Sequence, residues 1–156
     1  MSTKYLSRAA IIAAIYAAVT LLLAAVSFGP VQLRASEALT ILPVFTTAAI
    51  PGLTIGCIVA NLMGGYGIVD VIFGSAATLL GALGTRLLRK TPLAAALCPV
   101  VTNALIVGPM LYFVDSESPA LLFNMLTVGG GELVSCVALG LPLMWVLRKR
   151  PRLFEL

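Results

Sequence analysis

The sequence predicts an all-α integral membrane protein, a single bundle of six transmembrane helices with both termini in the cytoplasm. Hydrophobic residues make up 60% of the 156 residues and charged residues only 10%, whereas roughly a quarter of a soluble domain is charged. A helix needs about 20 residues to cross a bilayer, so six spans with short loops use nearly the whole chain. The basic residues gather at one set of span ends, as the positive-inside rule requires.

Six apolar runs make up the predicted spans, and each ends at residues that break a helix or carry charge. Gly-Pro, Pro-Gly and Gly-Gly pairs at 29–30, 51–52 and 64–65 close the first three runs, because Gly and Pro favour turns. A basic cluster at 86–90 closes the fourth run, and an acidic segment at 115–119 separates the last two. The predicted spans are approximately 7–28, 36–50, 52–64, 67–88, 93–114 and 120–147. The second and third are short, which leaves a re-entrant hairpin as the alternative there.

The distribution of Lys and Arg sets the predicted orientation, because positively charged loops stay on the cytoplasmic side. With six spans, the basic residues at 4–8, 86–90 and 148–152 all fall on one side of the membrane, together with both termini. The acidic segment 115–119 then faces the exterior. Five or seven spans would break this agreement. A signal peptide is the alternative for the first run, but that run is long enough to span and the residues after it are equally hydrophobic.

The sequence lacks the residues that several classes of function require. The chain has no His and no C-x-x-C pair, which argues against a zinc or haem site. It has no G-x-x-x-x-G-K-[ST] motif and therefore no P-loop for ATP hydrolysis. Cys57, Cys98 and Cys136 lie in apolar runs and are interpreted as packing residues. From these missing motifs we expect no catalytic residue, no metal and no cofactor. We also expect no nucleic-acid partner, since the positive charge lies at span ends.

Polar residues inside the apolar runs are the candidates for a binding site. A charged group at mid-bilayer costs at least about 2.5–3.5 kcal/mol and is rarely kept without a partner or a task. Asn61 and Asp70 lie near the outer ends of the third and fourth spans. Asn103 and Glu132 lie midway along the fifth and sixth, each roughly 18–21 Å below the 115–119 loop, and are expected at one level. The alternative for Asp70 and Glu132 is protonation or an internal clasp with Asn, Ser or Thr.

Residues in the outer half of the membrane complete the predicted pocket, which opens outward above the two mid-membrane residues. Arg34 and Glu37 stand three residues apart at the mouth of the second span, where a structural ion pair between them is the alternative. Tyr66 and Phe73 are expected to stack on a ligand, although an aromatic belt would place aromatic residues there too. Three glycines at 129–131 either bend the last span or allow a close approach to its backbone.

The first span carries a face without bulky side chains. Two helical rows form it: Ala9, Ala13 and Ala17, and beside them Ala10, Ala14 and Ala18. Small residues let helix backbones approach closely in lipid. We expect this face to dock to another subunit, and packing against the chain's own neighbouring span is the alternative.

Three segments resemble a known family: RASEALTILPVFTTAAIPGLTIGCIVANLMGGYGIVDVIFGSAATLLGAL at 34–83, PVVTNALIVG at 99–108 and GGGELVSCVALGLPL at 129–143. They are similar to the QueT family of queuosine-precursor transporters, which are substrate-binding S components of energy-coupling factor (ECF) transporters. The resemblance implies a six-helix bundle in a bacterial cell membrane and an outward-facing pocket. It also implies an alanine-rich first helix that meets a transmembrane coupling subunit, with two separate ATPase subunits as further partners.

The ligand that the resemblance implies is a 7-deazaguanine base, either a pre-queuosine base or queuine. Its edge offers adjacent N–H donors and a carbonyl acceptor, which a carboxylate plus an Asn amide can satisfy. Glu132 and Asn103 suit that edge, and an aminomethyl cation would prefer Asp70 or Glu37. Which precursor is bound stays open. The alternative function is a solitary proton- or cation-coupled secondary transporter or channel that uses Asp70 and Glu132.

Overall fold

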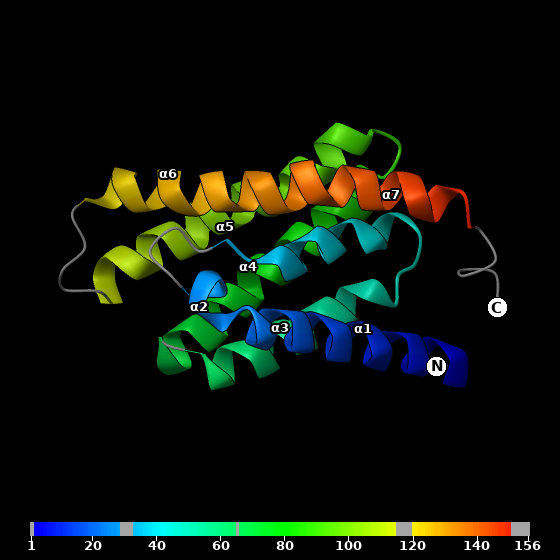
Figure 1. The fold of residues 1–156 in the computed structure, drawn as a ribbon, viewed down its shortest axis with the longest axis horizontal. Helices are drawn as coiled ribbons and strands as arrows, with labels where there is room; N and C mark the ends of the chain where they lie inside the picture. The colour runs from blue at the N-terminus through cyan, green and yellow to red at the C-terminus, as the bar shows by residue number, and fades with distance from the viewer. Residues whose placement is uncertain (1, 29–32, 65, 115–119, 151–156) are drawn as a thin grey trace.

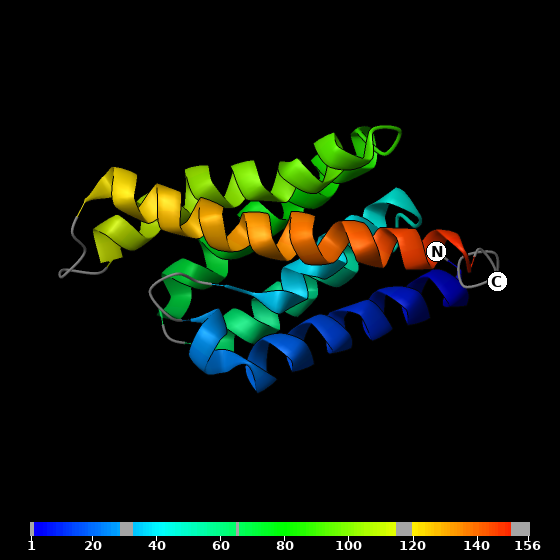
Figure 2. The same cartoon turned by 45° about the horizontal axis from the view of Figure 1, so that its top comes forward.

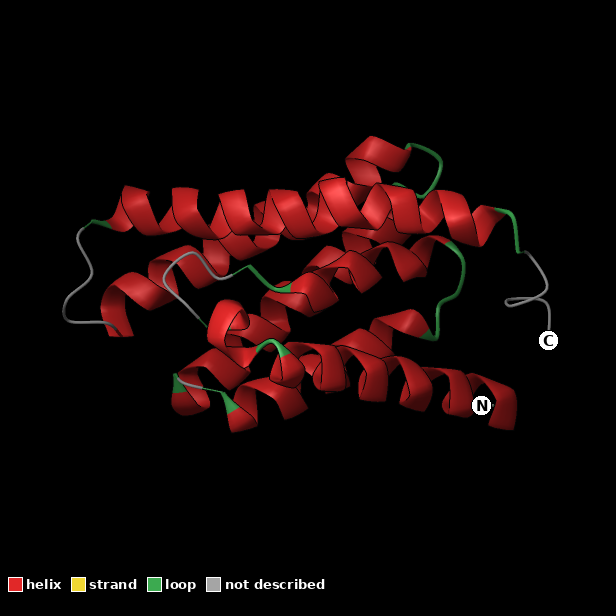
Figure 3. Cartoon of the chain, viewed as in Figure 1, coloured by secondary structure: helices red, strands yellow, loops and turns green. Residues whose placement is uncertain are grey.

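The structure, a computed structural model, describes residues 2–28, 33–64, 66–114 and 120–150, and the regular elements in these ranges are all helices (Figure 3). The elements in chain order are α1 (Thr3–Leu22), α2 (Ala24–Ser27), the 3₁₀ helix η1 (Ala35–Val44), α3 (Ala49–Met63), α4 (Gly67–Leu87), α5 (Pro92–Val114), α6 (Leu121–Glu132), the π-helix η2 (Leu133–Leu139) and α7 (Gly140–Arg148). The prediction of an all-α protein is confirmed for the described residues.

The helical segments run back and forth along one axis. α1, η1, α3, α4, α5 and the continuous rod of α6, η2 and α7 alternate in direction, so the start of α1 and the end of α7 lie at the same end of the bundle (Figures 1 and 2). α1 packs on α3, α3 on α4, α4 on α5 and α5 on α6. η1 lies in the interior, where it contacts α1, α3, α4, α5, η2 and α7. Its position makes η1 the element around which the others are arranged.

Four segments are long and apolar enough to cross a bilayer: Thr3–Leu22, Gly67–Leu87, Pro92–Val114 and Leu121–Arg148. The chain is therefore a multi-pass membrane protein. η1 and α3 are shorter apolar helices of 10 and 15 residues. At rises of about 2.0 and 1.5 Å per residue, each is roughly 20–23 Å long, short of a hydrocarbon core about 30 Å thick. That these two segments also span the membrane stays a prediction.

The bundle is apolar on its outside and holds buried ionisable side chains within, beside its apolar core clusters. The side chains of Leu22, Leu87 and Phe113 are more than 80% exposed, whereas Glu37 and Asp70 are at most 1% exposed. Exposed aliphatic and aromatic surface on this scale would be unfavourable in water but suits lipid, and ionisable groups in a membrane protein face the bundle interior. The interior is therefore the part of the molecule to search for a site.

The turn between the second and third segments falls earlier than predicted. η1 ends at Val44, whereas the predicted span continued to residue 50. α3 begins at Ala49, so Pro51 and Gly52 lie in its first turn rather than between two spans. Pro is accepted in a first turn because the N–H groups there have no partner within the helix. A Pro-Gly pair was therefore misread as a helix end when it marks a helix start.

α1 and α3 approach closely through their small residues. A Cβ added at Gly52 or Gly56 would lie 2.8 Å from the carbonyl oxygen of Ala9 or Ala13, respectively. Ala9, Ala13 and Ala17 are buried within the chain, so this row is not available to a partner subunit. Of the predicted docking face, only the second row, Ala10, Ala14 and Ala18, is exposed, and its docking role stays a prediction.

Candidate binding site

Five buried polar residues from distant parts of the chain gather around the start of η1. Arg34 immediately precedes η1 and Glu37 lies in its first turn. Asn61 lies near the end of α3, Asp70 in the first turn of α4, and Glu132 at the end of α6. Each is at most 4% exposed. We call these five residues the central cluster.

Arg34 forms an ion pair with Asp70 rather than the pair with Glu37 that the sequence left open. Its Nη2 lies 3.5 Å from Asp70 Oδ2. The guanidinium carbon lies 5.1 Å from the centroid of the Phe28 ring, a cation–π distance. Asn61 Nδ2 donates to Asp70 Oδ1 at 3.3 Å and to the Asp70 carbonyl oxygen at 2.9 Å. These contacts hold the start of η1, the end of α3 and the start of α4 together.

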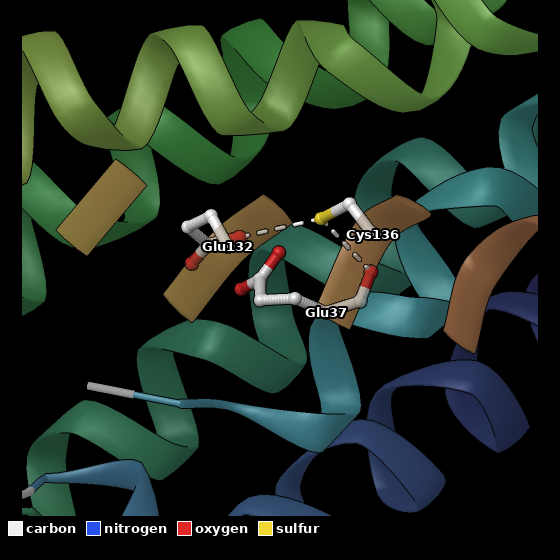
Figure 4. Close-up of side chains that lie close together, drawn as sticks. All are labelled: Glu37, Glu132 and Cys136. Atoms are coloured by element: carbon white, nitrogen blue, oxygen red, sulfur yellow. Dashed lines mark hydrogen bonds between the residues drawn. The ribbon is translucent and has the colours of Figure 1, made fainter. Parts of the chain in front are cut away.

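Glu37 and Glu132 face each other across the interior of the bundle (Figure 4). A carboxylate oxygen of each and Sγ of Cys136 all lie within 4.8 Å of one another. Cys136 Sγ lies 3.3 Å from Glu132 Oε2 and 3.6 Å from the Glu37 carbonyl oxygen. Tyr16 donates its hydroxyl proton to Glu37 Oε1. Glu37 was expected at the outer mouth, and this position is corrected: it lies at the level of Glu132, because η1 runs through the interior.

Both carboxylates lie where the helices depart from α geometry. η1 is a 3₁₀ helix of ten residues, although such runs rarely exceed four. Glu132 is the last α-helical residue before the π-helix η2. π segments occur frequently at functional sites, since their wider turn redirects side chains. The glycines at 129–131 precede this change of winding, and the chain continues there as one rod (Figure 1).

Two atoms of the central cluster lack hydrogen-bond partners. Glu37 Oε2 and Asn61 Oδ1 are buried and unpaired within the described part of the chain. Both are acceptors, and a buried acceptor without a partner costs about 1–3 kcal/mol. The cluster can therefore accept hydrogen bonds from a ligand that carries N–H or O–H donors.

The other three predicted site residues lie in different surroundings. Asn103 is buried, but its Nδ2 donates to the carbonyl oxygen of the residue four earlier in α5, at 3.1 Å. Phe73 is 47% exposed and lines an apolar groove of ≈ 390 Å³ between α4 and α5. Tyr66 packs against the apolar core shared by α4, α5 and α6. Asn103 and Glu132 were expected at one level beside the same ligand edge, which stays a prediction, and the residue that the structure places beside Glu132 is Glu37.

Two residues at the site were not predicted from the sequence. Tyr16 is fully buried at mid-helix in α1, whereas Tyr in membrane proteins is enriched at the interfaces. A tyrosine in the middle of a span was the signal that could have identified it. Cys136 was interpreted as a packing residue. It follows Glu132 by four residues, and this spacing places both on one helix face.

Glu37, Glu132 and Cys136 also have the spacing of a three-ligand metal site. Cys136 Sγ, however, lies at hydrogen-bonding distance from two acceptors, Glu132 Oε2 and the Glu37 carbonyl oxygen, to either of which its one thiol proton can be donated. Donation requires the thiol proton, whereas a metal ligand must be a thiolate. The observed arrangement therefore favours hydrogen bonding over metal coordination.

Comparison with known proteins identifies the family. The profile of a family described as QueT transporter matches residues 6–149. A 73-residue segment is 41% identical to the queuosine precursor transporter QueT of Lactococcus lactis subsp. cremoris (strain MG1363) and covers 46% of this chain and 43% of that protein. No solved structure is significantly similar. Because the profile extends from α1 to the end of α7, the chain belongs to the QueT transporter family.

Proposed function

We propose that this protein is the substrate-binding S component of an ECF transporter and that it captures a queuosine precursor, a 7-deazaguanine base, from outside a bacterial cell. The observation that carries the proposal is the central cluster, which places charged side chains and free acceptors inside a bundle of a transporter family. The ligand class is supported by the name of the relative from Lactococcus lactis, a queuosine precursor transporter.

The chemistry of the central cluster suits a guanine-like base. Such a base presents adjacent N–H donors and a carbonyl acceptor on one edge. The cluster offers the complementary groups: carboxylates and the free Asn61 Oδ1 accept, and the Arg34 guanidinium donates. Burial strengthens these interactions, because few water molecules compete and the local dielectric is low.

The exposed alanine row on α1 is the proposed docking surface for the coupling subunit. Ala10, Ala14 and Ala18 present no bulky side chain, so the backbone of a partner helix can approach closely. The energy for transport would come from two separate ATPase subunits. In this arrangement η1 and α3 complete six passes, with both termini in the cytoplasm.

Direct binding tests the ligand. Purified full-length protein is titrated with the nitrile precursor, the aminomethyl precursor and queuine. We expect binding of at least one, with lower affinity in Glu132→Gln and unchanged affinity in Phe73→Leu, whose side chain lines the outer groove. Absence of binding to all three compounds would contradict the proposal, as would a Glu132→Gln variant that binds every compound as the wild type does.

Co-purification tests the docking surface. Ala14→Trp places a large side chain on the exposed alanine row and is expected to abolish recovery of the coupling subunit without changing ligand affinity. Leu105→Trp is the control, since Leu105 is 57% exposed on α5 and lies on a different helix. Equal recovery of the coupling subunit with both variants would show that the alanine row is not the docking surface.

Reconstitution separates the proposed function from a solitary carrier, which the facing carboxylates would also suit. Vesicles that contain only this chain should show no uptake driven by a proton or sodium gradient. Uptake should appear when the coupling and ATPase subunits and ATP are added. Gradient-driven uptake by the chain alone would favour the carrier and contradict an S component.

A further inference from the structure

The buried charges of the bundle are not balanced. Among the described residues, four buried side chains can carry a formal charge at neutral pH: Arg34, Glu37, Asp70 and Glu132, each at most 4% exposed. Arg34 and Asp70 neutralise each other through the ion pair at 3.5 Å, the one salt bridge that the described residues contain. Glu37 and Glu132 therefore face each other, and neither forms a salt bridge with a cation among the described residues.

The hydrogen bonds that the described side chains donate to these two carboxylates come from neutral groups. Tyr16 donates its hydroxyl proton to Glu37 Oε1, and Cys136 donates its thiol proton to Glu132 Oε2. A neutral donor satisfies a lone pair but does not balance a negative charge, and a charge held in a low-dielectric interior requires a counter-charge or a proton. Glu37 Oε2 has no donor within the described structure, and its carboxylate points toward Glu132 (Figure 4).

An organic ammonium group matches both the unbalanced charge and the free acceptor. We infer that Glu37 and Glu132 form the subsite for a protonated primary amine on the ligand, so that a flat heterocycle with an aminomethyl cation is bound in preference to its neutral nitrile counterpart. An ammonium has three N–H donors and no acceptor, so it can donate to both carboxylates at once. This inference rests on the proposed function and assigns one end of the ligand to one part of the site.

The remainder of the central cluster is consistent with this assignment. Asp70 is already occupied by Arg34 and by Asn61 Nδ2, so it has little capacity to bind a second cation. Asn61 Oδ1 stays free to accept from the heterocycle. Different residues would therefore bind the two ends of the ligand: Glu37 and Glu132 its cation, and Asn61 its ring edge.

A matched pair of ligands tests the inference. Purified full-length protein is titrated with the aminomethyl compound and with the nitrile compound, which differ only in the charged group. Because hydrogen bonds to charged partners are the stronger ones, we expect the aminomethyl compound to bind at least about tenfold more tightly. In Glu132→Gln and in Glu37→Gln that ratio should fall toward one, mainly through weaker binding of the aminomethyl compound, while binding of the nitrile compound persists.

The outcomes separate the inference from the proposed function. Equal affinity for the two compounds in the wild type overturns the amine subsite and leaves the proposed function standing. An unchanged ratio in both Gln variants does the same when Glu132→Gln weakens the binding of both compounds equally. No binding of either compound overturns the inference, and no binding of queuine in addition overturns the proposed function itself. Thermal stabilisation by Zn²⁺ alone that is lost in Cys136→Ser would show a metal site and also overturn the inference. Thermal unfolding of each variant without ligand shows whether it is folded, and Glu132→Gln is decisive if Glu37→Gln does not fold.

Discussion

Replacing Gly56 by Ala tests whether the close contact between α1 and α3 holds the site together. The new Cβ would lie 2.8 Å from the carbonyl oxygen of Ala13 and 2.9 Å from Cβ of Tyr16, whereas ordinary contact begins at 3.4 Å. Both neighbours belong to the core of α1, and one of them is backbone, so rotation of a side chain cannot relieve the overlap. α1 must move away from α3 and take the Tyr16 hydroxyl with it.

The size of the effect depends on two opposing contributions. Ala is favoured over Gly in a helix by up to about 1 kcal/mol, and overpacking of a tight contact costs about 1–3 kcal/mol. Gly130→Ala measures the first contribution alone, because a Cβ there meets nothing within 4 Å. We expect the free energy of unfolding of Gly56→Ala to be about 2 kcal/mol lower than that of Gly130→Ala. For a chain of this size, that difference lowers the unfolding midpoint by about 4–8 °C.

Thermal unfolding of the purified variants in one detergent gives the comparison, and ligand titration gives the functional consequence. Movement of α1 weakens the hydrogen bond from Tyr16 to Glu37, so Gly56→Ala should also lose affinity for the ligand, whereas Gly130→Ala should not. If the two variants unfold at the same temperature and bind equally, α1 and α3 do not make this close contact, and its link to the site is refuted.

The remaining predictions concern the polar contacts of the interior. Arg34→Met alone and Asp70→Asn alone should each destabilise the fold by about 3–5 kcal/mol, because each leaves a buried charge without its partner, whereas the double variant should regain most of that loss. A double-mutant cycle in chemical denaturation measures this coupling, and strictly additive losses would show that the two charges do not interact. Tyr16→Phe removes one donor and leaves a buried Glu37 oxygen unpaired, which should cost about 1–3 kcal/mol. Unfolding measurements check this, with Tyr5→Phe as the control, since its hydroxyl donates an exposed hydrogen bond to the Thr47 carbonyl oxygen that water can replace. Equal stability of the two variants would show that the buried bond to Glu37 contributes no more than an exposed one.

Hydrophobic length and charge predicted the longer passes well. The fourth and fifth spans were expected at 67–88 and 93–114, and α4 and α5 occupy Gly67–Leu87 and Pro92–Val114. Their ends are marked by charge or by Pro and Gly, signals that act locally. The 3₁₀ conformation of η1 could not be predicted from such local signals, because packing inside the bundle, rather than local preference, sets a 3₁₀ helix of ten residues.

Burial of the charged residues was predicted from their place in apolar runs, but their pairing was not. Counting residues from a loop gives depth at about 1.5 Å per residue, and this placed Asn103 and Glu132 at one level. Depth does not say which way a side chain faces. That depends on helix rotation, and Asn103 is directed to its own helix while Glu37, carried inward by η1, faces Glu132.

The ion pair between Arg34 and Asp70 makes the placement of η1 depend on a later helix. Asp70 follows Arg34 by 36 residues and lies on α4, two helices later in the chain than η1. An arginine placed alone at the centre of a helix in the bilayer costs about 2.5–3.5 kcal/mol. η1 therefore depends on α4 for its place inside the bundle, and a chain cut off before α4 would lack the counter-charge for Arg34.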